Sequence, residues 1–306
     1  MSGQLGNVAK RGTDLGDVVI RLVGGLGNQM FQYAAAKAIA IRSGAELVLD
    51  LSWFATANER RYALEPLRVS AQTLGVISPE GAVVRFLRKV VYRFTKRSDE
   101  HWRGRPVFRE KIFNFDPAVL DIRAPVCLDG YFQSEKYFLD CRDLIASEFT
   151  VATPPGILAQ AMLEQMTTHD AICLHVRRGD YVASAITNAF HGLCSLDYYH
   201  QGLRIVSEGL LNPHCYVFSD DPEWVRANFS PALPMSVVDI HGPDEAHEDL
   251  RLMAACKHFV IANSSLSWWG AWLGSYPGKR VVAPKNWFQD SAKDVKDLIP
   301  GGWIRV

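Results

Sequence analysis

Residues 18–50 have the sequence VVIRLVGGLGNQMFQYAAAKAIAIRSGAELVLD. A short apolar run at Val18–Val23 leads into a Gly-rich turn, a helical pattern at Gln29–Ser43 and a second apolar run at Glu46–Asp50. Short β-rich runs that alternate with helical patterns are typical of βαβ units in parallel sheets. Gly44 stands where a helix C-cap is expected. The stretch therefore predicts an α/β fold that starts with a strand, a helix and a parallel strand.

The same alternation continues along the chain. In the first half, the pattern predicts a strand at Val126–Gly130, a helix at Ser134–Glu148 and a helix near 79–96 within the irregular region 52–125. The second half predicts strands at Ala171–Val176, Cys215–Phe218, Ser236–Asp239, Phe259–Ala262 and Val281–Ala283, with helices at Asp197–Glu208, Pro222–Phe229, Asp244–Cys256 and Leu266–Leu273. The segment TPPG at 153–156 is a plausible hinge. We therefore expect two α/β domains, 1–153 and 154–306.

The composition excludes several classes of protein. The chain has 306 residues, of which 33 are Lys or Arg and 33 are Asp or Glu, so no net field attracts nucleic acid. Neither a signal peptide nor an apolar stretch suited to a membrane span is evident. The six cysteines show no C-x-x-C or zinc spacing, which favours reduced structural thiols: Cys127, Cys141, Cys173, Cys194, Cys215 and Cys256. A soluble, cytoplasmic protein is expected.

One basic stretch has two interpretations. Residues 83–97, VVRFLRKVVYRFTKR, contain six Lys or Arg and no acidic residue. Such an amphipathic segment could make peripheral contact with an anionic membrane surface. The alternative is a solvated helix face whose charge is balanced by acids elsewhere.

The Gly-rich turn is the first candidate site. Backbone N–H groups of a turn that opens a helix suit an anion such as phosphate. The turn lacks the Lys-Ser/Thr of a P-loop. Gly25 and Gly27, with Asp50 after the next strand, nearly match the dinucleotide fingerprint, but Met30 replaces its third glycine. A merely structural tight turn remains the alternative to an anion site.

The segment HVRRGDY at 175–181 is the strongest candidate. It follows a predicted buried strand, at the edge where open α/β sheets bind ligands. The adjacent Arg177 and Arg178 could clamp a pyrophosphate through bidentate hydrogen bonds. The alternative is that they pair with acids such as Asp180.

Two further polar loops follow predicted strands. Ser219, Asp220 and Asp221 follow one of them, where Asp221 before Pro222 has the form of a helix N-cap and Asp220 could bind a base or ribose. Asn263, Ser264 and Ser265 follow another and offer donors to phosphate. The nearby Trp268, Trp269 and Trp272 could pack against the sheet or stack on a sugar. Convergence of these loops at one sheet edge favours a nucleotide ligand.

Taken together, these segments closely resemble the α-1,2-fucosyltransferases of glycosyltransferase family 11. The matching pieces are GGLGNQMFQYA at 24–34, HVRRGDY at 175–181, HGLCSLDYY at 191–199, FSDD at 218–221 and CKHFVIANSSLSWWGAWL at 256–273. Leu266 departs from the Phe that the family often has. The resemblance implies a GT-B-like fold of two Rossmann-like halves facing a cleft, with the donor held mainly by 154–306 and the acceptor by 1–153.

The resemblance also implies roles for individual residues. Arg177 would contact the β-phosphate and offset the charge on departing GDP. His175 and Asp221 would lie near guanine or ribose, Ser264 and Ser265 would bind the pyrophosphate, and Gly27, Asn28 and Gln29 would reach the donor from across the cleft. The remaining expected donor-site residues are Gly25, Arg178, Ser219, Asp220 and Asn263. Asp180 and His191 are candidates for the general base, and a strongly oxocarbenium-like transition state would need little help from a base.

The expected function is inverting transfer of L-fucose from GDP-β-L-fucose to the 2-hydroxyl of a galactose, without a metal or other cofactor. The acceptor would be a galactose-terminated oligosaccharide or lipid-linked glycan. Two alternatives stay open: a nucleotide-dependent oxidoreductase built on the Gly25-x-Gly27 turn, and a non-catalytic sugar-binding module that uses the Trp cluster.

Overall fold

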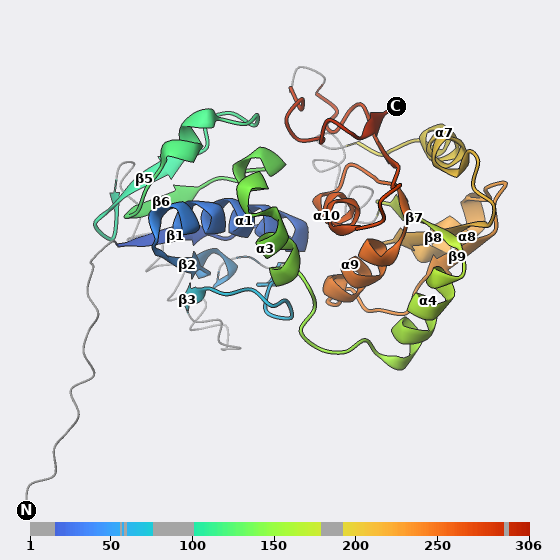
Figure 1. The fold of residues 1–306 in the computed structure, drawn as a ribbon, viewed down its shortest axis with the longest axis horizontal. Helices are drawn as coiled ribbons and strands as arrows, with labels where there is room; N and C mark the ends of the chain where they lie inside the picture. The colour runs from blue at the N-terminus through green and yellow to red at the C-terminus, as the bar shows by residue number, and fades with distance from the viewer. Residues whose placement is uncertain (1–15, 56, 58–59, 76–100, 179–191, 291–293) are drawn as a thin grey trace, which may run out of the picture.

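The computed structural model describes residues 16–55, 57, 60–75, 101–178, 192–290 and 294–306. Within these residues, two six-stranded sheets lie side by side, each flanked by helices (Figure 1). The first sheet is built from residues before 130 and the second from residues after 169. The segment 153–156 lies between the last helix of the first half, α3 (Arg142–Glu148), and the first helix of the second, α4 (Ile157–Thr167).

The first sheet has the order β3-β2-β1-β6-β5-β4. Its strands are β1 (Asp17–Arg21), β2 (Glu46–Asp50), β3 (Gln72–Leu74), β4 (His101–Trp102), β5 (Arg105–Arg109) and β6 (Val126–Asp129). All neighbours are parallel except β4 and β5. Helix α1 (Leu26–Ser43) connects β1 to β2 and ends at Gly44, whose φ of 61° is the left-handed conformation expected at a C-cap. The predicted opening βαβ unit is confirmed.

The second sheet has the order β12-β11-β10-β7-β8-β9. Its strands are β7 (Asp170–Val176), β8 (Pro213–Ser219), β9 (Met235–Val238), β10 (His258–Val260), β11 (Val281–Ala283) and β12 (Ile304–Arg305), and its helices besides α4 are α7 (Leu196–Ser207), α8 (Pro222–Asn228), α9 (Ala246–Ala255) and α10 (Ser265–Leu273). All pairs are parallel. Numbered from β7, this is the 3-2-1-4-5-6 order of a Rossmann sheet.

The second sheet has one point where the direction of its winding reverses. The reversal lies between β7 and β10, because β7 to β9 progress toward one edge of the sheet and β10 to β12 progress toward the other. In the first sheet, β1 to β3 and β4 to β6 progress in the same direction. Open α/β sheets bind ligands outside the carboxyl ends of the strands at such switch points, so the topology marks a place for a ligand in the second half.

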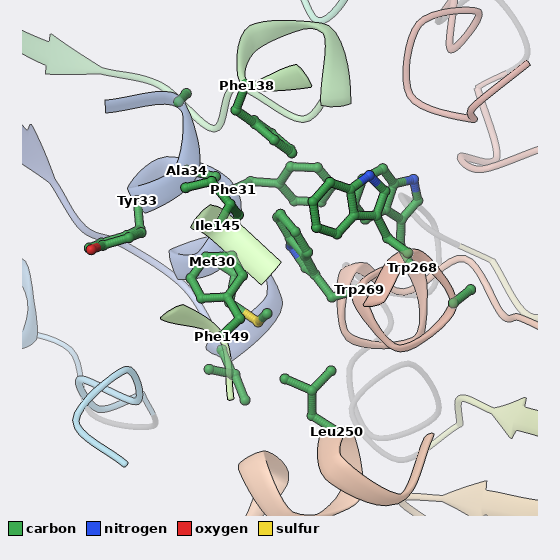
Figure 2. Close-up of a cluster of buried hydrophobic side chains, with 14 of the residues drawn as sticks. Met30, Phe31, Tyr33, Ala34, Phe138, Ile145, Phe149, Leu250, Trp268 and Trp269 are labelled. Carbon is green, nitrogen blue, oxygen red and sulfur yellow. The ribbon is translucent and has the colours of Figure 1, made fainter. Parts of the chain in front are cut away.

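A shared aromatic core joins the two halves. Phe31 of α1 lies 4.5 Å from Trp268 and 4.9 Å from Trp269 of α10, measured between ring centroids. Phe138 stacks on Trp269 at 5.4 Å, and Phe149 meets the same ring edge-on (Figure 2). These side chains are buried, so the packing interpretation of the Trp cluster is confirmed and the sugar-stacking interpretation is wrong.

Some predicted elements need correction. The helix expected at Ser134–Glu148 is broken into two short 3₁₀ turns, η3 (Glu135–Tyr137) and η4 (Leu139–Cys141), followed by α3. The break occurs at Phe138, whose φ of −139° and ψ of 16° are not helical and whose ring is drawn into the aromatic core. The sequence patterns also missed β3, β4, β5, β12 and α4.

Three further predictions concern the segment 79–97, the cysteines and membrane-spanning helices. The helix near 79–96 and the basic stretch 83–97 lie outside the described residues. All six cysteines are free thiols. Among the helices that the structure describes, none is long and apolar enough to cross a membrane.

Candidate functional site

The two arginines after β7 are held by the loop after β8. Arg177 Nη1 lies 3.0 Å from Asp220 Oδ2, and the backbone N–H of Arg178 donates to Asp220 Oδ1 at 2.8 Å. Both oxygens of this one carboxylate therefore fix the Arg177–Arg178 segment. Because β7 and β8 are parallel neighbours, their carboxyl ends bring the two loops together. The arginine pairs with an acid as the alternative interpretation proposed, but the acid is Asp220.

Arg178 occupies a different environment from Arg177. Its guanidinium carbon lies 3.7 Å from the ring centroid of Trp224, and its Nε lies 3.7 Å from Asp221 Oδ2. Asp221 is the N-cap of α8 and accepts from the backbone N–H of Trp224 at 3.1 Å, as its place before Pro222 predicted. The Ser219 hydroxyl accepts from the N–H of Asp221 at 3.0 Å. These contacts fix Arg178 and Asp221 at the margin of the site.

His175 is a buried neutral base beside the arginines. It is 3% exposed, and its Nδ1 has no hydrogen-bond partner within the described protein. Burial, with a second contribution from the charge of Arg177, lowers the pKa of His175 to about 4. The imidazole is therefore uncharged near neutral pH.

Helix α10 starts at the switch point of the second sheet without a side-chain cap. Its N-cap is Ser264, whose hydroxyl makes no capping hydrogen bond, and its first turn carries no acid. The first N–H groups of such a helix favour an anion. Asn263 is buried instead: its amide donates to the carbonyls of Gly192 and Trp287 at 3.2 and 3.3 Å. Ser264 and Ser265 are thus only partly buried, whereas Asn263 is buried and holds the neighbouring loops.

The Gly-rich turn of the first half meets the start of α10. A Cβ on Gly27 would lie 2.5 Å from the backbone nitrogen of Leu266 and 2.6 Å from Ser265 Oγ. Trp269 Nε1 also donates to the carbonyl of Gly27 at 3.0 Å. Helix α1 has no side-chain cap and no acid in its first turn, so two uncapped helix N-termini converge here. Their partial positive charges add at one place.

This contact decides between interpretations of the turn. In a dinucleotide site, the second glycine lets the pyrophosphate approach the backbone. Here the space beside Gly27 is filled by the backbone of Ser265 and Leu266. Met30 is fully buried where the fingerprint has its third glycine. The geometry does not support the oxidoreductase alternative.

Two side chains of the turn bind protein groups. Gln29 is fully buried; its amide donates to the carbonyls of Gly24 and Arg61, and its oxygen accepts from the N–H of Ala63 at 2.8 Å. Asn28 accepts from Gln133 Nε2 at 2.8 Å. The Gln29 amide therefore stabilises the conformation of the turn and has no remaining N–H with which to bind a donor substrate.

Sequence reasoning missed several residues near the turn. A Cβ on Gly25 would lie 3.6 Å from Arg60 Nη1, which places another cation beside the turn. Glu110 follows β5 and takes two backbone hydrogen bonds. Neither residue lies in a recognisable motif, and only the tertiary contacts of Arg60 with the turn and of Glu110 with the loop after β6 reveal them. Asp180 and His191, the expected base candidates, lie outside the described residues.

A metal site is not evident in the described part of the chain. No group of three or more His, Cys, Asp or Glu side chains is arranged there to hold a metal ion. The described cations around the candidate site include Arg177, Arg178 and Arg60.

Comparison with protein families adds to this geometry. Residues 7–306 match the model of glycosyl transferase family 11. An α-1,2-colitosyltransferase of Escherichia coli is 32% identical over 293 residues, covering 94% of this chain and 98% of that protein. The Escherichia coli O-antigen biosynthesis glycosyltransferase WbnK is also 32% identical, covering 93% of this chain and 99% of that protein. A galactoside 2-α-L-fucosyltransferase of Caenorhabditis elegans is 31% identical over 155 residues, which cover 48% of this chain and 41% of that protein.

A solved structure shares the architecture. A mutant of Arabidopsis thaliana FUT1 in complex with GDP aligns with a TM-score of 0.50 and 10% sequence identity, covering 93% of this chain and 74% of that one. The likeness concerns the fold. Together with the two parallel-sheet halves, it confirms the GT-B-like architecture predicted from the motifs.

Proposed function

Because the chain belongs to glycosyl transferase family 11, we propose that it transfers L-fucose from GDP-β-L-fucose to the 2-hydroxyl of a galactose, forming an α-1,2 linkage. One observation carries the proposal. The uncapped N-termini of α1 and α10 meet at Gly27 and Ser265, and Arg177 projects from the neighbouring strand end. A diphosphate is the part of a sugar nucleotide that such a cluster of N–H groups and cations would bind.

The residues around this point would bind different parts of the sugar-nucleotide donor. Ser264, Ser265 and the first N–H groups of α10 would bind the pyrophosphate, while Gly25 and Asn28 would border it from the other half and Gly27 would hold the start of α10 in place. His175, Ser219, Asp220 and Asp221 lie on the β7–β8 side and would face the nucleoside. Arg178 would support this side from its position on Trp224.

Arg177 would act on the leaving group. Transfer with inversion breaks the bond between the anomeric carbon and the β-phosphate oxygen, and that oxygen gains negative charge. A guanidinium fork that binds two phosphate oxygens stabilises this charge in the transition state. Asp220 holds Arg177 at 3.0 Å, so the side chain is already positioned near the place where phosphate would bind.

Colitose is the second candidate for the transferred sugar. The Escherichia coli relative that covers 94% of this chain is named for that sugar. Colitose is L-fucose without its 3-hydroxyl group, so both donors present the same diphosphate and the same 6-deoxy ring. The contacts that separate them would be made to the 3-hydroxyl.

The experiment is a donor and acceptor matrix. The purified protein is incubated with GDP-fucose or GDP-colitose and a panel of galactose-terminated glycans, and the products are analysed for linkage. An α-1,2-fucosylated galactose supports the proposal, and transfer of colitose alone selects the second candidate. GDP binding without transfer of either sugar would instead favour a sugar-binding module.

We also expect transfer without a divalent metal ion. The diphosphate charge would be offset by Arg177, Arg178 and the two helix N-termini. Activity should therefore survive incubation with EDTA, measured as product formed per minute before and after chelation. Complete loss in EDTA that Mn²⁺ or Mg²⁺ restores would contradict this part of the proposal.

A further inference from the structure

A second polar cluster lies at the carboxyl ends of three adjacent strands of the first sheet. Its residues follow β1, β6 and β5, three parallel neighbours whose carboxyl ends lie at one edge. Asn28 follows β1, Tyr131 and Gln133 follow β6, and Glu110 follows β5 directly. Loops at the carboxyl ends of parallel strands are the part of an α/β sheet that binds ligands, so this edge is a second candidate.

Glu110 is held in place by the loop after β6. Its Oε2 accepts from the N–H of Tyr131 at 2.7 Å, and its Oε1 accepts from the N–H of Phe132 at 3.0 Å. Phe132 adopts a φ of 52°, a costly conformation for a bulky residue, while its ring is fully buried. Gly130 leaves no room for a Cβ against the stem of Glu110. The backbone is thus bent around this carboxylate.

The environment of Glu110 favours a proton acceptor. Burial raises the pKa of Glu110 to about 7, and the two backbone N–H donors lower it only in part. The negative charge of Glu110 interacts with the phenols of Tyr131 and Tyr137 and contributes to the raised pKa of each. The ion pair of Arg109 with Asp129 lies at the ends of the same two strands. A carboxylate with a pKa near the working pH suits general base catalysis.

Tyr131 gives the cluster an apolar surface. The residue is 44% exposed, and its backbone N–H donates to the Glu110 carboxylate, whose charge also raises the pKa of the Tyr131 phenol. An exposed aromatic ring beside a carboxylate offers a sugar both a stacking face and a hydrogen-bond acceptor. The ring and the carboxylate together fit a pyranose better than a charged ligand.

The cluster is connected to the candidate donor site. Gln133 Nε2 donates to Asn28 Oδ1 at 2.8 Å, and the adjacent Gly27 packs against Ser265 of α10. On the other side, Phe113 contacts Phe288 of the second half at a centroid distance of 5.1 Å. The edge that carries Glu110 therefore faces the half that carries Arg177.

We propose that the edge formed by Glu110 and Tyr131 is the subsite for the acceptor sugar, and that Glu110 is the catalytic base. The inference rests on the proposed function. The acceptor hydroxyl oxygen forms the new bond to the anomeric carbon, its proton passes to the Glu110 carboxylate, and the electron pair of the broken bond leaves with GDP. Tyr131 stacks on the ring that bears the hydroxyl.

The test of the base uses Glu110→Gln. We expect kcat to fall by about a hundredfold or more, a loss within the range for a general base, with GDP affinity unchanged. The wild-type kcat/KM should fall below about pH 7, and this acid limb should vanish in the variant. Glu135→Gln is the matched control, because Glu135 accepts from Trp272 Nε1 away from this edge; it should keep the acid limb.

Variants of Tyr131 test the acceptor subsite separately, and they keep the proposal testable if Glu110→Gln does not fold. Tyr131→Ala should raise the acceptor KM about tenfold or more with a smaller change in kcat, and Tyr131→Phe should stay near wild type. A folded Glu110→Gln enzyme with wild-type kcat and its acid limb overturns the base, and an unchanged acceptor KM in Tyr131→Ala overturns the subsite. Either result leaves the proposed function standing, whereas a wild-type protein that transfers no sugar refutes the function first.

Discussion

The geometry of the Arg177 guanidinium should matter as much as its charge. Arg177→Lys keeps the positive charge but replaces a planar fork with a point charge on a flexible stem. We expect kcat to fall about a hundredfold, the size of effect seen when one donor to a developing charge is lost. GDP affinity should fall less, because Ser264, Ser265 and the N-terminus of α10 still bind the ground-state diphosphate.

The measurement is kcat and GDP affinity for Arg177→Lys, with folding checked by thermal melting. Arg226→Lys is the control, since Arg226 forms an exposed 2.8 Å ion pair with Asp239 in the same half. It should behave as wild type. A folded Arg177→Lys enzyme with near wild-type kcat would remove Arg177 from the mechanism.

The burial of His175 predicts a loss of stability in acid. Its folded pKa of about 4 lies below the ordinary value of 6.5. In that window the unfolded chain binds a proton that the folded chain excludes, so stability falls as the pH is lowered from about 6.5 to about 4. At pH 5 this group alone should cost about 2 kcal/mol relative to neutral pH.

Urea unfolding at pH 7 and pH 5 measures the effect of His175. His175→Gln cannot titrate and should show a smaller decrease than wild type, whereas His200→Gln, at an exposed position, should show the full decrease. Equal decreases in wild type and His175→Gln would show that residue 175 does not resist protonation in the folded protein.

At the scale of the structural elements, the contact between α1 and α10 should tolerate little added side-chain volume. Gly27→Ala would place a methyl group 2.5 Å from the backbone nitrogen of Leu266, which cannot move without shifting α10. We expect a destabilisation of about 1–3 kcal/mol, as for other overpacked sites, together with weaker GDP binding because the start of α10 is displaced.

Gly25→Ala is the matched comparison for Gly27→Ala. Its nearest atom beyond the chain neighbours would be Arg60 Nη1 at 3.6 Å, and its φ of −82° is open to any residue. Denaturant unfolding should therefore give near wild-type stability for Gly25→Ala. If the two variants are equally stable, the close approach at Gly27 is not a constraint.

Elements with regular apolar patterns were predictable from the sequence. The strands Glu46–Asp50 and Val281–Ala283 have the predicted bounds, because each is a short run between clear turn signals. The edge strands β3 and β4 are only three and two residues long, and β5 contains Pro106, so none of the three gives a periodic signal. Helix α4 has an amphipathic pattern that sequence reasoning overlooked: Ala159, Met162, Leu163 and Met166 share one helix face and pack in or against the core.

For the candidate site, the loops at strand ends were predictable from the sequence, but the contacts between distant segments were not. Loops after buried strands identified Arg177, Asp220 and Ser265, since parallel strands bring their carboxyl ends together. The partner of Gly27 lies 238 positions away at Ser265, so no local pattern could show that this glycine serves a helix contact. Glu110 was missed for the same reason: the N–H groups that position it belong to Tyr131 and Phe132.

At the scale of the whole molecule, the site depends on how firmly the halves are joined. Their junction is a continuous buried core rather than a polar hinge, with Phe31 and Phe138 from one half packed on Trp268 and Trp269 from the other. Interfaces that are large and apolar restrict the relative motion of domains. The sheet edges that carry Arg177 and Glu110 should therefore keep a fixed relative position.

The same core should make the two halves unfold together. Trp269 is fully buried, touches Phe31, Phe138 and Phe149, and donates to the carbonyl of Gly27. Trp269→Ala should lower the free energy of unfolding by about 3–5 kcal/mol, the usual loss for a large buried aromatic ring. Because Trp269 packs against residues of both halves, unfolding of one half should destabilise the other. In the wild-type protein, the loss of circular dichroism and the loss of GDP binding should therefore occur in one denaturation transition.

The control is Leu211→Ala, which removes an apolar side chain that is 98% exposed and should leave the transition in place. In Trp269→Ala the coupling between halves is weakened, so the loss of GDP binding should precede the loss of secondary structure as denaturant rises. Two separate transitions in the wild-type protein would contradict the shared core. Unchanged stability in Trp269→Ala would do so equally, because it would mean that the aromatic contacts between α1 and α10 contribute nothing to holding the two sheet edges together.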